Sequence, residues 1–414
     1  MSAIAQNKHE PKVRGLTVLI TGSIMQLFLG ILYIWSIFVR PVSEVFNWHI
    51  DSVKLTSSFM LSFFVVGIIA GGKLHIKFGS HMVVLCGGLL LSFGMLMTSF
   101  LPPNAAWLMY ITYGIIGGFG VGSAYNAIIC AAQKWFPQRR GFATGVVVCA
   151  FGLSTVLFAP LIKTFIEQFE LRNTFMILAG IFFTATMVLF RFIRLPDENV
   201  QVSSSSSANA YAAAMLAKRQ YVITETIKTK EFYFLAVSLA FATAPFFILN
   251  PSFITYAAER NAEAFGLVIV MMTGVANACG RLSVPLLSDK IGREKTALTV
   301  LIITAINALL LSFAQGGLFI TVVLATAFCF GGLPGLFSVF AVDYFGIKNA
   351  GANYGAIMMG FAVSALTFPM LIGLIPHEYE SVRFITLSAM AIAGAILMIM
   401  LLIFKKRKET ARES

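Results

Sequence analysis

Charged residues are scarce in this chain of 414 residues, where Asp, Glu, Lys and Arg together make up 12% and hydrophobic residues 58%. Soluble globular domains carry about 25% charged residues, so this balance excludes a water-soluble fold and predicts that most of the chain lies in lipid. The longest polar stretch, residues 195–231, is too short to hold a soluble signalling domain. This argues against a membrane sensor.

Cysteine and histidine are rare as well, with five residues of each. The cysteines all fall within apolar runs, and their spacing indicates neither a disulfide framework nor a metal site. The histidines lie outside the apolar runs and form no catalytic constellation. The glycine-rich stretch Gly114–Gly122 lacks the preceding strand and the lysine of a phosphate-binding loop. We therefore expect neither enzymatic activity nor a cofactor.

Acidic residues are missing from the interiors of the apolar runs, since every Asp and Glu falls in a loop or at a helix end. An exporter of cationic drugs needs a buried acid, so that class is disfavoured. A membrane-embedded carboxylate is also the usual proton relay of a symporter, and its absence favours exchange or facilitated diffusion. Proton symport stays open, because the substrate or a tyrosine–arginine network can carry the proton.

What the chain does contain is twelve apolar runs, each long enough to cross about 30 Å of hydrocarbon as a helix. They are Leu16–Phe38, Leu55–Leu74, Met82–Phe100, Ala106–Ala132, Gly141–Ile162, Thr174–Ile193, Phe232–Tyr256, Phe265–Leu287, Thr296–Ala314, Leu318–Val342, Gly351–Leu374 and Val382–Phe404. We predict an all-α membrane protein with six helices in residues 1–194, six in residues 232–414, and a linker at 195–231. Within the linker we expect one short surface helix, at Ala210–Lys218.

The basic residues predict the orientation of these helices. If the N-terminus is cytoplasmic, inner segments carry 23 Lys and Arg, whereas outer loops carry six. This asymmetry places both termini on the cytoplasmic side of the inner (plasma) membrane and explains the net charge of +12 without a nucleic-acid partner. The polar start, Met1–Gly15, lacks a signal-peptide cleavage pattern. We expect a multi-pass monomer whose partners are the lipid bilayer and a small substrate.

One cation does not fit this pattern. Arg281 lies inside the apolar run Phe265–Leu287, where a charge costs about 3 kcal/mol on insertion scales. We interpret it as the fixed positive charge that holds an anion in a transport path. The alternative is a structural arginine bonded to backbone carbonyls of neighbouring helices. Asn277 shares its helix face at i and i+4, so it can orient the guanidinium, or else join two helices.

Further polar groups occur at membrane depth. Tyr33, Tyr125 and Asn126 are candidates to bind a substrate carboxylate together with Arg281 and Asn277. A tyrosine hydroxyl can hydrogen-bond a carboxylate while its ring closes the pocket. The alternative for the tyrosines is anchoring at the membrane interface. That role fits Tyr125 less well, because it falls in the middle of its run.

A short pattern recurs after the second helix of each predicted half. The first copy is the loop Gly72–Gly79, and the second is the loop Pro285–Arg293. Both share a Lys-x-Gly core, which predicts a tight turn at glycine. The second copy also has an acid, Asp289, which can cap a helix or pair across the interface between the halves. We predict a conformational motif formed by Gly72, Lys77, Gly79, Asp289, Lys290, Gly292 and Arg293. Two chance basic turns are the alternative.

Twelve spans, a central linker and these paired turns resemble the major facilitator superfamily. A narrower resemblance rests on Tyr33–Pro41, Lys134–Gly145, Gly280–Arg293 and Asp343–Gly355. Together these stretches resemble the oxalate/formate antiporter family, which is akin to the monocarboxylate transporters. The resemblance implies an organic-anion carrier that works by alternating access, with a site near the membrane midplane between its two halves.

The resemblance also implies roles for single residues. In such carriers an arginine of span 8 binds a substrate carboxylate, and Arg281 occupies that place. The oxalate carrier has a second cation, a lysine in span 11, but Gly351–Leu374 contains none and Phe361 falls near that position. We therefore expect a monocarboxylate such as formate, lactate or pyruvate, or else oxalate/formate exchange. A proton-coupled monocarboxylate symporter and a carrier of another small-molecule class are the alternatives.

Overall fold

The computed structural model of the chain describes residues 2–136, 140–196, 219–346 and 349–413, and all regular structure in them is helical. The helices before the linker are α1 (Ser2–Leu29), η1 (Gly30–Tyr33), α2 (Trp35–Phe46), α3 (Ile50–Phe78), α4 (Ser80–Ser99), η2 (Pro103–Leu108), η3 (Tyr110–Gly117), α5 (Gly118–Trp135), α6 (Arg140–Leu189) and η4 (Phe190–Phe192). Apolar chain in lipid must satisfy its backbone hydrogen bonds internally, and a helix does so.

The helices that follow repeat this plan. They are α8 (Ile223–Thr226), α9 (Lys230–Leu249), η5 (Asn250–Ser252), α10 (Phe253–Glu259), η6 (Glu263–Phe265), α11 (Gly266–Ile291), α12 (Arg293–Leu311), α13 (Gly316–Phe345), α14 (Ala350–Ile357), α15 (Met359–Gly373), η7 (His377–Tyr379) and α16 (Glu380–Glu413). The predicted surface helix Ala210–Lys218 lies outside the described residues.

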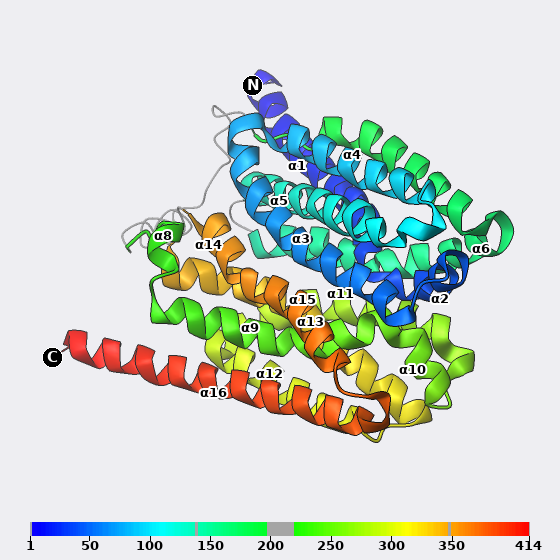
Figure 1. Ribbon diagram of the computed structural model, residues 1–414. Helices are drawn as coiled ribbons and strands as arrows, with labels where there is room; N and C mark the ends of the chain where they lie inside the picture. The colour runs from blue at the N-terminus through cyan, green and yellow to red at the C-terminus, as the bar shows by residue number, and fades with distance from the viewer. Residues whose placement is uncertain (1, 137–139, 197–218, 347–348, 414) are drawn as a thin grey trace.

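Eleven helical segments of the described residues are long and apolar enough to span a membrane. One of them, Phe142–Phe192, has 51 residues, whereas about 20 suffice for one crossing. Inside it, Glu170 has the non-helical angles φ 65° and ψ 165°, and the chain turns back there, so α6 holds two successive spans (Figure 1). The prediction of twelve spans in two six-helix halves is thereby confirmed.

Spans 1 and 7 are interrupted. Span 1 passes through η1 between α1 and α2, and span 7 passes through η5 between α9 and α10. At η5, Pro251 cannot donate a backbone hydrogen bond, which favours the break. Pro245 and Pro334, by contrast, stay within continuous helices, α9 and α13.

The two halves meet along α6 with α11, α3 with α14 and α15, and α2 with η5. Glycine allows the closest approach between α6 and α11. A side chain at Gly274 would clash with Thr155, and a Cβ at Gly152 would lie 3.1 Å from the backbone nitrogen of Ala278. Small residues at helix contacts let backbones approach closely in membranes.

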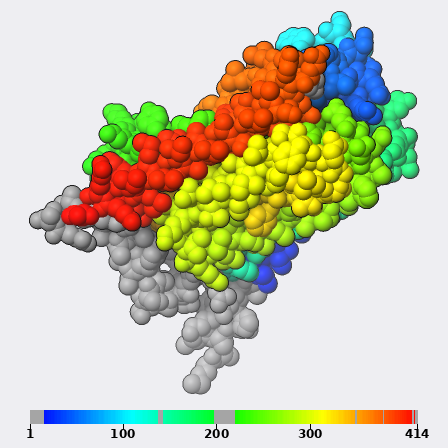
Figure 2. All heavy atoms as spheres, turned by 90° about the horizontal axis from the view of Figure 1, so that it is seen from below, coloured from blue at the N-terminus to red at the C-terminus, as the bar shows by residue number. Residues whose placement is uncertain are grey.

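The outer surface is apolar, as a bilayer requires. Figure 2 shows α16 (red) lying beside α12 (yellow), and the two helices pack against each other. Ile302 and Ile306 of α12 and Ile392 and Ile396 of α16 are exposed on this outer surface. Both chain termini lie at the same end of the bundle, opposite α2 and α10 (Figure 1). That end is the cytoplasmic one in our prediction from the basic residues.

Candidate functional site

The site is built around Arg281, in the middle of α11. Its side chain is buried, with 4% of the residue exposed. The preceding residue is Gly280, at which a Cβ would clash with the carbonyl of Phe328 on α13. The glycine therefore lets α11 and α13 lie close together, which helps to enclose the guanidinium group.

Side chains, and not backbone carbonyls, hold the guanidinium group. Its Nε donates to Oδ1 of Asn277 at 2.6 Å, one turn earlier on the same helix. One terminal nitrogen donates to the Tyr33 hydroxyl at 3.2 Å, and the other lies 3.5 Å from the Tyr125 hydroxyl, at the limit of a hydrogen bond. The structural-arginine alternative, with bonds to main chain, is not what the described residues form.

No ion pair of Arg281 occurs among the described residues. The charge is instead faced by aromatic rings: its guanidinium carbon lies 5.3 Å from the ring centre of Phe151 and 5.9 Å from that of Tyr33. Ring faces attract a cation, but they do not neutralise it as a carboxylate does. Arg281 is therefore a buried positive charge with hydrogen-bond partners and without a negative one in the described part of the chain.

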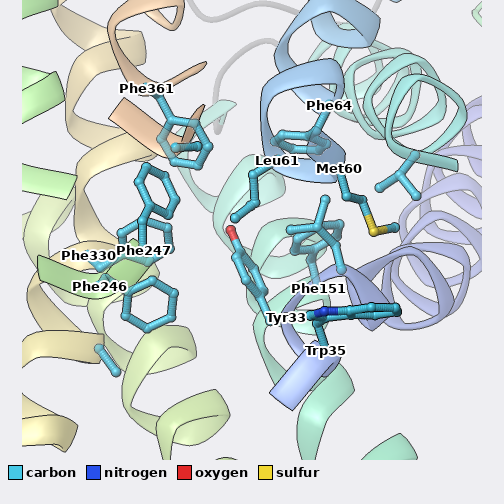
Figure 3. Packing of buried hydrophobic residues seen from close by; sticks show 14 of the residues in the cluster. Tyr33, Trp35, Met60, Leu61, Phe64, Phe151, Phe246, Phe247, Phe330 and Phe361 are labelled. Carbon is cyan, nitrogen blue, oxygen red and sulfur yellow. The ribbon is translucent and has the colours of Figure 1, made fainter. Parts of the chain in front are cut away.

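An aromatic layer surrounds this group on both sides of the interface. Figure 3 shows Phe64 and Phe151 from the first half facing Phe246, Phe247, Phe330 and Phe361 from the second, with Tyr33 between the two groups. Tyr33 contacts Phe151, Phe246 and Phe330 edge to face, at centroid distances of 5.6, 6.0 and 5.8 Å. These rings pack around the buried guanidinium group.

The structure brings together four of the five residues proposed from the sequence. Tyr33 (η1) and Tyr125 (α5) come from the first half, and Asn277 and Arg281 (α11) from the second. Asn126 is not with them, because its Nδ2 donates to the carbonyl of Ile68 at 2.8 Å. Membrane depth alone does not say which side of α5 a residue occupies, and Asn126 lies on the side that packs against α3.

A residue beside Arg281 was missed. Phe151 of α6 is fully buried, and its ring centre lies 5.3 Å from the guanidinium carbon. The sequence held no signal for this contact, because a phenylalanine inside an apolar run is typical of any membrane-spanning helix.

The repeated motif turns as predicted, but it is mostly helical and not a loop. Gly79 and Gly292 have φ values of 79° and 95°, which favour glycine, and each connects one span directly to the next. Gly72 lies within α3, where a Cβ would approach the Asn126 amide at 2.8 Å. Lys77 lies in the last turn of α3, over the ring of Phe78, and Lys290 in the last turn of α11.

The acid of this motif pairs within its own half. Asp289 forms an ion pair with Arg293, and Arg293 also lies 3.5 Å from Asp343 at the end of α13. Of the two roles considered for Asp289, pairing across the interface is not what the described residues form. The contacts tie the turn between α11 and α12 to α13.

Comparison with known families agrees with this architecture. The family model described as Major Facilitator Superfamily matches residues 18–285 and 235–414. The chain belongs to the major facilitator superfamily. Proteins of this family are membrane transporters and not enzymes, so the chain is a multi-pass membrane transporter by family.

Individual relatives are distant but cover most of the chain. It is 26% identical over 364 residues to an uncharacterized MFS-type transporter, YhjX, of Escherichia coli (strain K12), covering 86% of each chain. It is 26% identical over 360 residues to the oxalate:formate antiporter of Oxalobacter formigenes, covering 83% of this chain and 80% of the relative. Monocarboxylate transporter 12 of Xenopus laevis is 24% identical over 328 residues, covering 73% of this chain and 69% of the relative.

Proposed function

We propose that this protein is a secondary transporter of small organic anions, and that Arg281 binds the substrate carboxylate. The observation that supports this most is the composition of the guanidinium shell. Two tyrosine hydroxyls of one half and an asparagine of the other contact a buried cation that has no carboxylate partner among the described residues. A substrate anion would supply the missing negative charge.

The site also favours alternating access. Because Arg281 belongs to the second half and its tyrosine partners to the first, rocking the halves apart changes the shell around the bound anion. An anion held between the halves in the closed state would lose one set of contacts when either side opens. We propose that residues 1–194 and 232–414 are the moving halves, that 195–231 joins them, and that Gly79 and Gly292 mark the turns of a conformational motif.

A monocarboxylate such as formate, lactate or pyruvate is the substrate that the aromatic layer fits best. Phe361 lies near the place where the oxalate carrier is expected to have a second cation, and it packs on Phe247 and Phe330 at 4.7 and 5.7 Å. A second carboxylate would lie against rings and would be unpaired in a medium of low dielectric constant. Similarity to an oxalate:formate antiporter keeps oxalate/formate exchange as the second candidate.

Counterflow in proteoliposomes tests this proposal. Vesicles loaded with unlabelled formate, lactate, pyruvate or oxalate should accumulate the labelled form of at least one monocarboxylate, and oxalate should be transported less well. Failure of all four anions to exchange would contradict the proposal. Uptake that follows an imposed pH gradient without internal substrate would replace exchange with proton symport, which stays a candidate because the tyrosine–arginine group can carry a proton.

A further inference from the structure

Two buried polar side chains close to the aromatic layer have no hydrogen-bond partner among the described residues. Ser36 lies in the first turn of α2, and Asn250 is the first residue of η5. They are 5% and 1% exposed, and neither the hydroxyl of Ser36 nor either polar atom of the Asn250 carboxamide is bonded within the part of the chain that the structure describes. Most buried polar groups in proteins are bonded, because an unpaired one gives up its bonds to water without replacement. Such groups therefore indicate a place where a ligand can supply the bonds.

Asn250 lies on the helix face that carries part of the aromatic layer. Its backbone angles are helical, φ −53° and ψ −49°, and its N–H donates to the carbonyl of Phe246, so the helical path of α9 continues through it. Helical residues three and four apart share a face, so Asn250 lies one turn beyond Phe246 and Phe247. The ring centre of Phe246 lies 6.0 Å from that of Tyr33, whose hydroxyl accepts from Arg281 (Figure 3). The carboxamide is thus about one turn from the rings around the guanidinium group.

Ser36 takes the corresponding place in the first half. Turn hydrogen bonds continue from η1 into α2, so Ser36 follows Tyr33 by about one turn. Asn250 likewise follows Phe246 by about one turn. Both steps lead toward the end of the bundle at which α2 and α10 lie, and α2 packs against η5 there (Figure 1). The two unpaired side chains therefore belong to contacting elements of the two halves, on the same side of the aromatic layer.

The chemistry of the unpaired atoms defines the group that fits them. A carboxamide offers two N–H donors and an accepting oxygen, and a serine hydroxyl both donates and accepts. An alcohol hydroxyl matches this set, since it also donates one hydrogen bond and accepts others. A methyl group would leave the atoms unpaired. A second carboxylate could only accept hydrogen bonds, and it would bring another negative charge into an apolar layer.

We propose that Ser36 and Asn250 form a subsite for a hydroxyl group of the transported anion. This rests on the proposed function: Arg281 binds the carboxylate, and the subsite selects a short monocarboxylate that carries an alcohol over one that does not. The two residues are then the positions that determine specificity among monocarboxylates. Because they belong to different halves, both hold the hydroxyl only while the side of α2 and α10 is closed.

Pairs of anions that differ only in a hydroxyl test the subsite: lactate against propionate, and 3-hydroxybutyrate against butyrate. In equilibrium binding to the full-length protein, the wild type should bind the hydroxylated member of at least one pair about tenfold more tightly. Asn250→Leu, which keeps a side chain of similar size and removes both polar atoms, should bind the two members equally. Ser36→Ala should reduce the preference by about threefold. Formate, which has no carbon to carry the hydroxyl, should lose less affinity in Asn250→Leu than the hydroxylated anion does.

Asn307→Leu is the matched control. Nδ2 of Asn307 is likewise buried without a partner among the described residues, but its helix, α12, packs against α16 on the outer surface of the second half. This variant should keep the preference of the wild type, and its loss here would overturn the inference. So would equal binding of both members of each pair by the wild type, the result expected if water alone bonds the subsite, or a preference that survives in Asn250→Leu. Those outcomes leave the proposed function intact, whereas a wild type that binds none of the five anions would contradict it, and the subsite with it.

Discussion

At the scale of single residues, the account depends on how Arg281 is satisfied. An arginine has five N–H donors and keeps its charge under all physiological conditions. Three of its donor contacts go to Asn277, Tyr33 and Tyr125, and none goes to a carboxylate in the described part of the chain. A carboxylate that replaces a neutral hydroxyl brings an opposite charge and can accept two parallel N–H bonds from the guanidinium group, so binding an anion here is favourable.

The tyrosine hydroxyls can be tested one at a time. Tyr33→Phe removes an acceptor of Arg281 but keeps the ring, and we expect anion affinity to fall about fivefold, measured by equilibrium binding. Tyr113→Phe is the matched control, because the hydroxyl of this buried tyrosine has no partner in the described residues. It should leave affinity unchanged. Equal affinities in Tyr33→Phe and the wild type would remove Tyr33 from the site.

Phe361 is the position at which we test selectivity between substrates with one and with two carboxylates. We expect Phe361→Lys to raise oxalate counterflow relative to formate, since it places a second cation in the aromatic layer. The buried lysine should also lower thermal stability, and oxalate should restore part of it. Phe361→Leu, which stays apolar, serves as the control. An unchanged ratio of oxalate to formate in Phe361→Lys would show that this position does not face the substrate.

At the scale of helices, the interface between the two halves depends on close packing of α6 against α11. A methyl group at Gly274 would clash with Thr155. A methyl group at Gly180 of α6 would have no neighbouring heavy atom within 4 Å. We expect Gly274→Ala to lower the free energy of unfolding by about 1–3 kcal/mol and to slow transport. Gly180→Ala should do neither. Thermal unfolding and counterflow measure both effects, and equal behaviour of the two variants would contradict the packing described here.

The sequence predicted the helices better than their relative placement. Asn277 could be paired with Arg281 because they are one turn apart on one helix, and Tyr33 and Tyr125 could be proposed from their depth. Depth does not fix rotation about a helix axis, so Asn126 was placed in the site although it bonds to α3. The local pattern likewise does not reveal that Phe151 faces the guanidinium group, because this contact joins residues distant in sequence.

At the scale of the whole molecule, the structure joins the halves across the site. Cys149 of α6 and Cys279 of α11 lie at this interface: Cys149 is one turn from Gly152, whose Cβ would lie 3.1 Å from the backbone nitrogen of Ala278, the neighbour of Cys279. If the halves rock, a short bifunctional thiol reagent should cross-link them and block counterflow, and a bound monocarboxylate should change the rate. Cys149→Ser is the control and should be insensitive. Full transport after complete cross-linking would contradict movement at this interface.

The most direct test of the central claim is anion binding by Arg281 variants. We expect Arg281→Ala to abolish saturable binding of the transported monocarboxylate, and Arg281→Lys to bind with intermediate affinity, because lysine keeps the charge but loses the two-pronged grip on a carboxylate. Thermal unfolding without anion checks that both variants are folded. Binding at wild-type affinity by both variants would contradict the assignment of Arg281 as the residue that holds the substrate.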